Sequence, residues 1–296
     1  MKEIVLITGA NGSLAKTVKE LISNRYEIRS LTTNKNSVNK KSIFYWDINK
    51  KHIDTNALNN CNHIIHLSGY SILKRWTKKN KKLMYESRIG GANLLFEKCK
   101  ELDISPTTFI SASASGIYGL TATGLKTEQD NIGLDWVAKM ANDWEMSAQK
   151  FSELGTRVVK MRLSLLLSYN SGFLKYTILS MKYGVGIITG EKKDPINWIH
   201  MDDVANFIKK SLQEEKYQGA YNLANQHKIS QEKFLKTIKK ELFPYSLILR
   251  VPIFFIRLIL GKRSMIINSK INLSVEKLHK SNFVWKYSKL EDVLKN

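Results

Sequence analysis

Cysteine, proline and long apolar runs are all scarce in this sequence, and each shortage excludes a class of protein. Only two cysteines occur among 296 residues, Cys61 and Cys99, with no second cysteine near either. We therefore expect a reduced, cytoplasmic protein without a structural disulfide. With four prolines and no low-complexity tract, the chain offers no candidate for a long linker. The longest apolar stretch, residues 246–260, is broken by two arginines and a proline, so the sequence predicts no transmembrane segment.

Acidic residues are scarce as well: 26 of them stand against 47 lysines and arginines, for a formal charge of +21. A field of that sign would attract a nucleic acid or an anionic membrane. The lysines are spread along the chain, however, and are not gathered with aromatic residues on one element, so we expect no specific nucleic-acid partner. Residues 246–260 leave two alternatives open, a helix docked on its own protein or a basic amphipathic segment on a membrane surface.

What the sequence does contain is a regular alternation of strand and helix patterns. The expected strands lie at 3–8, 26–31, 42–46, 62–67, 107–111 and 156–167, and the expected helices at 14–22, 81–102 and 135–154. This order predicts an α/β fold, a Rossmann-type doubly wound parallel sheet with right-handed crossovers. Later helices are expected at 172–181, 203–212 and 230–242, the last capped by Ser230, with a loop at 183–197.

These patterns also predict how the chain is divided. We expect a dinucleotide-binding domain over residues 1–165, with 198–212 packing back onto it. A smaller C-terminal α/β lobe over 166–296 should cover the substrate.

The most specific motif is a glycine-rich turn at residues 9–15 (GANGSLA), between the first strand and the first helix. Gly9 suits a tight turn, Gly12 leaves room for a pyrophosphate, and Ala15 is small enough for close packing of helix on strand. The N–H groups at the start of that helix add a site for phosphate oxygens. The motif therefore predicts dinucleotide binding, with these residues at the pyrophosphate: Gly9, Asn11, Gly12, Ser13 and Leu14.

The end of the second strand bears on which dinucleotide is bound. An acidic residue there would bind the ribose of NAD and repel the 2′-phosphate of NADP. This chain has Thr32, Thr33 and Lys35 instead, which could accept the phosphate, so we expect NADP(H) to be preferred over NAD(H). Asp47, after the third strand, could bind the adenine amino group or simply hold a turn.

Several motifs occur in an order that resembles a known family. They are the glycine turn, 66–69 (HLSG), 75–77 (RWT), 87–88 (SR), 111–119 (SASASGIYG), 143–145 (DWE), 157–162 (RVVKMR) and 198–203 (WIHMDD). Over nearly the whole chain they are similar to the YfcH-like, epimerase-family branch of the extended short-chain dehydrogenases/reductases. The resemblance implies the same fold and an NADP(H) site but supplies no substrate. It also implies further cofactor contacts by Leu67, Ser68, Gly69, Arg88 and Ser111.

The usual catalytic pair of extended short-chain dehydrogenases is absent. The resemblance implies a Tyr and a Lys four residues apart on the helix after the fifth strand, where the Tyr exchanges a proton with substrate. The motif at 143–145 sets the register of that helix and places Val137 and Ala141 at the two positions. A Tyr-x-x-x-Lys does occur at 70–74, but it lies in a loop, and we interpret it as coincidental.

Other side chains could take over catalysis or merely support the fold. Ser113 could donate a hydrogen bond to a substrate carbonyl or cap a turn, and Tyr118 could replace the missing acid or only pack. Glu128 resembles a carboxylate near the substrate pocket of extended dehydrogenases. Asp202 and Asp203 come before a helix, where capping is the ordinary role.

Four more side chains are candidates for contacting substrate: Arg75, Trp76, Arg162 and Trp198. Arg75 and Trp76 could bind an anionic or planar substrate, or they could close a lid. Arg162 could clamp an anion or form a buried salt bridge. The six histidines show no metal-ligand spacing, so we expect no metal.

Taken together, these features predict an NADP(H)-binding oxidoreductase or epimerase-like enzyme for an unknown small molecule, acting as a monomer or homodimer. The competing hypothesis is a binding protein that kept the cofactor, lost catalysis and reports the NADPH level to a partner. The missing Tyr and Lys motivate that alternative.

Overall fold

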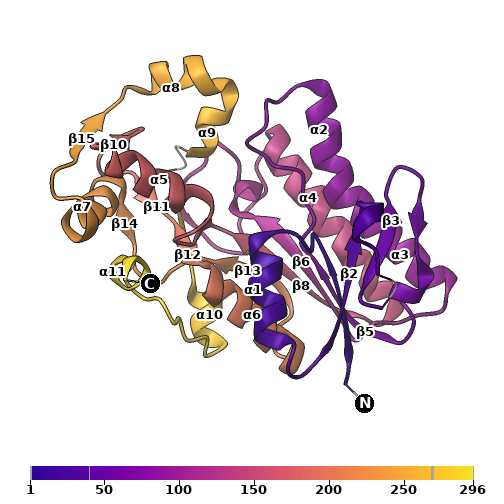
Figure 1. The fold of residues 1–296 in the computed structure, drawn as a ribbon. Coiled ribbons are helices and arrows are strands. Elements are labelled where there is room, and N and C mark those ends of the chain that lie inside the picture. Colours follow the sequence, from indigo (N-terminus) through magenta and orange to yellow (C-terminus); the bar gives the residue numbers. More distant parts are fainter. Residues whose placement is uncertain (1, 40, 268–269, 296) are drawn as a thin grey trace. The chain divides into compact units, whose positions relative to one another are not determined.

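The computed structural model describes residues 2–39, 41–267 and 270–295, and it divides into two compact units (Figure 1). Unit 1 comprises Met1–Ser113, Met140–Arg162 and Ala205–Tyr221, and unit 2 comprises Ala114–Lys139, Leu163–Val204 and Asn222–Asn296. The units are therefore interleaved along the chain, whereas the sequence predicts two consecutive segments with one short return. The last segment of unit 1 spans residues 205–221.

Unit 1 is built on an eight-stranded sheet in the order β13-β8-β6-β5-β1-β2-β3-β4. Its strands are β1 (Ile4–Thr8), β2 (Glu27–Thr32), β3 (Ile43–Asp47), β4 (His52–Ile53), β5 (Cys61–His66), β6 (Thr108–Ala114), β8 (Arg157–Leu163) and β13 (Gly219–Leu223). Strand β1 runs parallel to both β2 and β5, and the β2–β3 and β5–β6 pairs are parallel too. Without the edge strands β4 and β13, this is the strand order of the doubly wound dinucleotide-binding fold, which confirms the predicted fold class.

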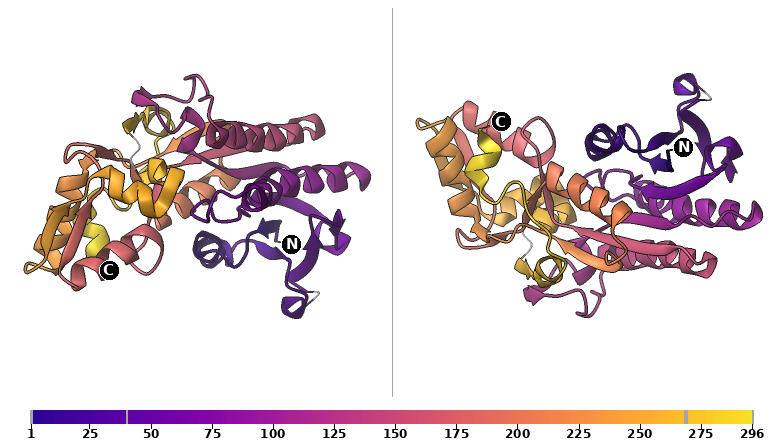
Figure 2. Two further views of the ribbon diagram at one scale, coloured as in Figure 1. Left: turned by 90° about the horizontal axis from the view of Figure 1, so that it is seen from above. Right: turned by 90° about the horizontal axis from the view of Figure 1, so that it is seen from below.

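The residue pattern explains why these elements form. Every residue of β1 is buried, as a central strand of a parallel sheet covered on both faces requires. Helix α1 (Ser13–Ile22) buries Ala15, Val18 and Ile22, a spacing that gives one apolar face. The chain winds outward from β1 in opposite directions along the sheet. Right-handed crossovers therefore place α1 and α3 (Gly91–Glu101) on opposite faces, as Figure 2 shows.

The helix that the sequence predicts at 81–102 is interrupted by a π-helical turn. The structure has α2 (Lys78–Tyr85), a π turn over Glu86–Gly90, and then α3. Gly91 begins α3 where a side chain has no room, because a Cβ there would lie 3.0 Å from Cε1 of His66. Single π turns inside helices are frequently found at functional sites.

One hydrophobic cluster of unit 1 lies on the sheet face that α3 and α4 (Trp136–Gln149) cover. The rings of Phe109 and Phe151 stack there with centroids 3.8 Å apart. Cys61 and Cys99 belong to the same core and are both unpaired. Burial raises the pKa of each thiol to about 12, so both behave as small apolar side chains.

Unit 2 is assembled from two-stranded ribbons and short helices. The ribbons are β7 (Thr123–Lys126) with β16 (Lys270–Leu273), β9 (Leu165–Leu167) with β12 (Trp198–His200), β10 (Val185–Ile188) with β15 (Leu247–Arg250), and β11 (Pro195–Ile196) with β14 (Ile229–Ser230). The helices are α5 (Gly172–Lys182), α7 (Gln231–Leu242), α8 (Ile253–Leu260), α9 (Ser264–Ile267), α10 (Glu276–Lys280) and α11 (Leu290–Leu294), while α6 (Met201–Gln213) runs from unit 2 into unit 1.

The structure tests two predictions for unit 2, the helix cap at Ser230 and the loop at 183–197. The Ser230 cap is confirmed, since its hydroxyl accepts a hydrogen bond from the N–H of Lys233 at 3.2 Å. The loop expected at 183–197 is wrong, because β10 and β11 lie within it. Among the described helices, none combines the length and the apolar character needed to cross a membrane.

Candidate functional site

The turn between β1 and α1 is shaped so that only glycine fits at its first position. Gly9 has a φ of +67°, and a Cβ there would lie 2.8 Å from the carbonyl carbon and oxygen of Leu67. The N–H of Gly12 donates to the carbonyl oxygen of Gly9 at 2.9 Å and closes the turn. A Cβ on Gly12 would lie 3.2 Å from that same oxygen. At Gly9 and Gly12 the turn therefore presents backbone without a side chain to an approaching ligand.

The start of α1 is open to an anion. Gly12 is the N-cap residue and has no side chain with which to cap the helix, and the first turn contains no acidic residue. The first N–H groups of a helix lack intrahelical partners and carry partial positive charge. Asn11, Gly12 and Ser13 are all exposed. These features together suit the pyrophosphate of a dinucleotide.

This turn lies at the point where the strand order reverses. Strand β1 sits between β2 and β5, and ligands of such sheets bind at the carboxyl ends of the strands on either side of that reversal. Thr8, which ends β1, is tied directly to the end of β5. Its hydroxyl oxygen accepts hydrogen bonds from the N–H groups of Leu67 and Ser68, each at 3.2 Å. The same oxygen lies 2.9 Å from Nδ1 of His66.

The hydrogen bonds of His66 define its tautomer. Its Nε2 lies 2.9 Å from the carbonyl oxygen of Arg88, which can only accept, so Nε2 carries the proton. Nδ1 must then accept a hydrogen bond from the Thr8 hydroxyl. The lone pairs of that hydroxyl oxygen are therefore free to accept from the N–H groups of Leu67 and Ser68. Burial lowers the pKa of His66 to about 4, so the ring is neutral at neutral pH.

The Arg88 side chain fixes the loop that follows β5. Its Nη1 donates to the carbonyl oxygens of Tyr70 at 2.9 Å and Met84 at 3.0 Å. Its guanidinium carbon lies 5.1 Å from the ring centroid of Trp144, a cation–π distance. Gly69 runs so close to the guanidinium that a Cβ would lie 3.0 Å from Cζ. Burial lowers the pKa of Arg88 to about 10, which still leaves the group charged at neutral pH.

The π turn supplies a second anchor for the same loop. Ser68 donates from its hydroxyl to the carbonyl oxygen of Ser87 at 3.0 Å. The Ser87 hydroxyl in turn accepts from the N–H of Tyr70 at 2.8 Å. The structure thus brings Leu67, Ser68 and the other predicted cofactor residues of this segment together beside the glycine turn.

The end of β2 offers hydroxyls and an ammonium group but no carboxylate. Thr32 is buried and its Oγ1 accepts from the N–H of Asn34 at 3.1 Å. Thr33 and Lys35 are exposed, and the ammonium of Lys35 lies 5.2 Å from the ring centroid of Tyr45. Thr33 and Lys35 are therefore both accessible to a phosphate.

Asp47 holds a turn at the end of β3. Its Oδ1 accepts from the N–H groups of Lys50 at 3.2 Å and Asn49 at 3.0 Å, and the hydroxyl of Tyr45 donates to its Oδ2 at 3.2 Å. These bonds, that of the Lys50 N–H first, keep the pKa of Asp47 below its usual value. The sequence leaves two roles open for Asp47, binding adenine or holding a turn, and in the structure it holds a turn.

Ser113 belongs to a buried polar network in unit 1. Its hydroxyl donates to Oε1 of Glu145 at 2.7 Å. Arg162 binds the same carboxylate with two bonds, from Nε at 2.8 Å and from Nη2 at 3.0 Å. Arg162 therefore forms the buried salt bridge and is not an open anion clamp. Ser111, also buried, donates to the carbonyl oxygen of Ala112 at 2.9 Å.

Glu145 is a functional candidate that the sequence reasoning missed. There it served only to fix the register of the helix, and no partner was assigned to it. A carboxylate on the buried side of a helix needs a cation and hydrogen-bond donors. Arg162 at the end of a buried strand is the signal that could have identified the pair.

Tyr118 and Glu128 meet at one residue of unit 2, Asn222. The Tyr118 hydroxyl donates to Oδ1 of Asn222 at 2.6 Å. The backbone N–H of Asn222 donates to Oε1 of Glu128 at 2.8 Å, and its side-chain amide donates to the carbonyl oxygens of Lys126 and Ser274. The sequence predicts roles for Tyr118 and Glu128 but no connection between them, since Asn222 lies about a hundred residues further along the chain.

The candidates for substrate contact do not form one cluster. Arg75 is exposed and Trp76 is half-buried in the loop before α2, where the indole N–H of Trp76 donates to the carbonyl oxygen of Ile72 at 2.9 Å. Trp198 is only 1% exposed and lies in the apolar core of unit 2 with Phe234. Strand β12 turns its side chain into that core, so the predicted substrate contact by Trp198 is wrong for this structure.

Both positions of the missing catalytic pair are packing positions. Val137 and Ala141 are one turn apart on α4, and both are buried. The side chain of Val137 packs so closely on Gly116 that a Cβ there would lie 3.0 Å from Cγ1. Neither side chain can exchange a proton.

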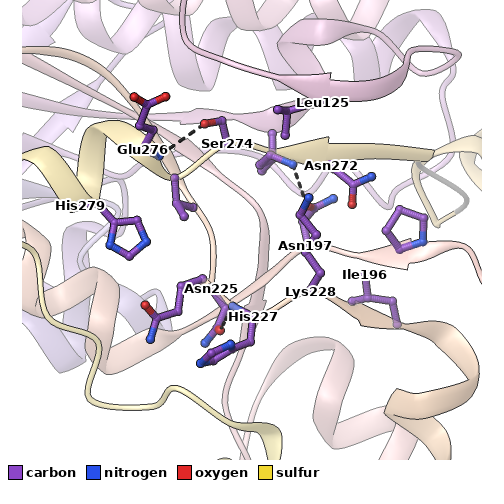
Figure 3. A pocket seen from close by; sticks show the side chains of 14 residues that line it. Leu125, Ile196, Asn197, Asn225, His227, Lys228, Asn272, Ser274, Glu276 and His279 are labelled. Carbon is purple, nitrogen blue, oxygen red and sulfur yellow. Dashed lines mark hydrogen bonds between the residues drawn. The ribbon is translucent and has the colours of Figure 1, made fainter.

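Unit 2 also contains a cavity of about 260 Å³ that is separate from the predicted site residues. Figure 3 shows His227, His279 and Asn225 around it. The amide of Asn225 donates to the carbonyl oxygen of Tyr287 at 2.7 Å and accepts from the N–H of His227 at 2.8 Å. No predicted site residue lines this cavity.

Comparison with known proteins bears on the family. Residues 5–224 match the model of the NAD dependent epimerase/dehydratase family. An epimerase family protein of Staphylococcus aureus is 30% identical over 294 residues, which cover 98% of this chain and 97% of that protein.

Solved structures with the same fold include two similar proteins of low sequence identity. The human epimerase family protein SDR39U1 (isoform 2), solved with NADPH, has a TM-score of 0.83 at 18% identity and covers 99% of this chain and 98% of that one. A nucleoside-diphosphate sugar epimerase of Corynebacterium glutamicum has a TM-score of 0.79 at 22% identity over 99% of this chain. This chain spans only 57% of the length of that epimerase. The family match and the Staphylococcus relative together show that the chain belongs to the NAD dependent epimerase/dehydratase family.

Proposed function

We propose that this protein is an NADP(H)-dependent oxidoreductase or epimerase-like enzyme that acts on a small molecule. The observation that carries the proposal is the turn at the reversal point of the sheet. Gly9 has no room for a side chain, and α1 begins without a side-chain cap or an acidic residue. Membership of the NAD dependent epimerase/dehydratase family supports the same function.

In this proposal each part of unit 1 binds one part of the dinucleotide. The backbone of Asn11, Gly12, Ser13 and Leu14 holds the pyrophosphate, and Ser68, Gly69 and Arg88 hold the nicotinamide half. Leu67, Ser111 and Asp47 complete the proposed contacts. When bound, the nicotinamide gives or takes a hydride. The chain itself then has to orient the substrate and move the accompanying proton.

The choice of NADP(H) over NAD(H) rests on the end of β2. Thr33 and Lys35 are exposed there with no carboxylate beside them, and one solved neighbour contains NADPH. Lys35→Glu should weaken NADPH binding roughly tenfold or more, because a charge-assisted contact to phosphate is replaced by repulsion. NADH affinity should stay unchanged, and Lys79→Glu on α2 is the matched control. Equal loss of NADPH and NADH affinity in Lys35→Glu would contradict the proposed phosphate contact.

We propose Ser113, Tyr118 and Glu128 as the groups that handle the proton. The hydroxyls of Ser113 and Tyr118 now donate to Glu145 and Asn222, so a substrate oxygen would have to replace one of these bonds. Ser113→Ala and Tyr118→Phe should each lower turnover by about a hundredfold. The affinity for NADPH should stay within about threefold of wild type, since neither hydroxyl is assigned to the cofactor phosphates.

The measurement is NADP-linked turnover on a panel of small molecules that includes nucleoside-diphosphate sugars. Retention of every detected activity in both variants would show that the assignment of these residues is wrong.

The second candidate function is a sensor that binds NADP(H) without catalysis. The buried, apolar Val137 and Ala141 at the positions of the usual Tyr and Lys favour it. A wild-type protein that binds NADPH tightly but turns over no member of the panel would support the sensor. Turnover that depends on Ser113 or Tyr118 would exclude it.

A further inference from the structure

Unit 2 leaves many large apolar side chains exposed. Most of the large hydrophobic side chains that the structure leaves exposed lie in unit 2 between residues 173 and 258. Soluble monomers rarely expose large contiguous apolar patches, and such patches usually mark an interaction site.

Helix α8 is the most prominent part of this surface. Its eight residues, IFFIRLIL, include no acidic residue. Phe254 is 63% exposed, Phe255 54% and Leu258 68%. A helix that packs on its own protein buries its apolar face, but α8 presents these side chains to solvent.

The ribbon before α8 continues the same character. Strands β10 and β15 pair in parallel with Ile187 opposite Leu249. Leu247 and Leu249 are two residues apart, so they point to the same side of the ribbon. All three side chains are exposed, and β15 ends at Arg250, shortly before α8 begins at Ile253. We call Ile187, Leu247, Leu249, Phe254, Phe255 and Leu258 the α8 surface.

The two segments that contain the α8 surface carry an excess of positive charge. The flanking basic residues within 172–193 and 245–263 are Lys175, Lys182, Lys192, Lys193, Arg250, Arg257, Lys262 and Arg263. The same two segments contain a single acidic residue, Glu191, which is paired with Arg250. These two segments therefore combine exposed apolar side chains with basic ones, within a chain whose net charge is +21.

We propose that the α8 surface binds the surface of an anionic lipid bilayer. Aromatic and aliphatic side chains on a short helix, flanked by arginine and lysine, are typical of segments that lie in the membrane interface. The basic residues are attracted to anionic headgroups while the apolar ones enter the acyl boundary. Eight residues are too few to cross a bilayer, so α8 lies along it. Of the two alternatives that the sequence leaves open for residues 246–260, the proposal takes the second, a basic amphipathic segment on a membrane surface.

The first test is sedimentation of the full-length protein with vesicles. We expect binding to vesicles of phosphatidylglycerol and phosphatidylcholine in equal parts, and little binding to phosphatidylcholine alone. Phe254→Ser combined with Phe255→Ser should weaken that binding at least about tenfold, because two apolar side chains no longer enter the bilayer. The matched control is Leu134→Ser with Val284→Ser, which removes two side chains that are 88% and 74% exposed elsewhere in unit 2.

The second test addresses charge. Each basic residue at an anionic surface contributes about 1 kcal/mol, or roughly fivefold, so Arg257→Gln with Lys262→Gln should weaken binding about 25-fold. Lys78→Gln with Lys79→Gln on α2 is the control and should change it far less. All variants alter exposed side chains, and unchanged circular dichroism would show that they fold.

Three outcomes would overturn the proposal. One is wild-type protein that stays in the supernatant with anionic vesicles, and another is equal binding to neutral and anionic vesicles. The third is a dimer that the double Phe variant dissociates while vesicles bind neither form, since the α8 surface would then bind a second copy of this chain. None of these outcomes depends on NADP(H) binding, so the proposed function would be unaffected.

Discussion

At the scale of single residues, His66 decides the geometry at the end of β5. Its protonated Nε2 donates a hydrogen bond to the carbonyl oxygen of Arg88, and its unprotonated Nδ1 accepts one from the Thr8 hydroxyl. Thr8 can then accept from both Leu67 and Ser68. A second proton on the ring would compete with this arrangement, because Nδ1 would become a donor facing the Thr8 hydroxyl. The loop beside the glycine turn therefore depends on a neutral imidazole.

The buried ring predicts a pH dependence of stability. Burial lowers the pKa of His66 from 6.5 to about 4 in the folded protein, so between these values the unfolded chain binds more protons and stability falls as pH falls. Relative to His66→Asn, the wild type should lose about 2 kcal/mol of unfolding free energy between about pH 7 and about pH 5. Urea unfolding of both proteins at the two pH values measures this. Equal losses in the two proteins would show that His66 does not carry the effect.

Residue identity alone could predict some site residues but not others. Gly9 and Gly12 were predictable, because two glycines at that spacing between a strand and a helix are typical of a dinucleotide-binding turn. Asn222 was not, because its partner Tyr118 lies about a hundred residues away in the sequence. Glu145 could have been found through Arg162, at the end of the next strand. A large aromatic such as Trp198 suits both a pocket and a core, and only the fold distinguishes the two.

At the scale of elements, local patterns predict what local forces decide. The strands β1, β2, β3, β5, β6 and β8 and the helices α1, α4 and α7 follow from apolar spacing and from one cap at Ser230. Strands β10 and β11 were missed because two to four residues are too few to show a period. The π turn over Glu86–Gly90 was missed as well, since the same apolar spacing fits an uninterrupted helix.

Long-range contacts explain the remaining differences. Asp203 lies in the first turn of α6, where capping is the ordinary role, but its carboxylate accepts from the N–H groups of Lys286 at 2.6 Å and Tyr287 at 3.3 Å. It therefore fixes the C-terminal segment. In the same way, β7 belongs to unit 2 because it pairs with β16, a partner nearly 150 residues later that no local pattern indicates.

At the scale of the whole molecule, the two units contain different sets of proposed functional residues. Unit 1 contains all the residues proposed to bind the dinucleotide, and it has the strand order expected for that task. Unit 2 contains Tyr118, Glu128 and the α8 surface. The excess of basic residues could be read from the sequence, but the exposure of the apolar helix between them could not, because exposure depends on how unit 2 folds.

The glycine turn of unit 1 is the proposed NADP(H) site. Calorimetric titration with NADPH, NADP, NADH and NAD, on the wild type and on Gly12→Asp, tests it most directly. Gly12 is the N-cap of α1 with ordinary extended backbone, and Asp is a favourable N-cap, so the variant should fold. Its carboxylate would occupy the phosphate position and repel the ligand. Ser230→Asp is the control, because it places the same charge at the start of α7.

We predict tight binding of NADPH and NADP to the wild type and to Ser230→Asp. In Gly12→Asp the affinity should fall by at least about a hundredfold, since both the space and the charge of the anion site are lost. Binding of none of the four dinucleotides to the wild type, or equal binding to Gly12→Asp, would contradict the account.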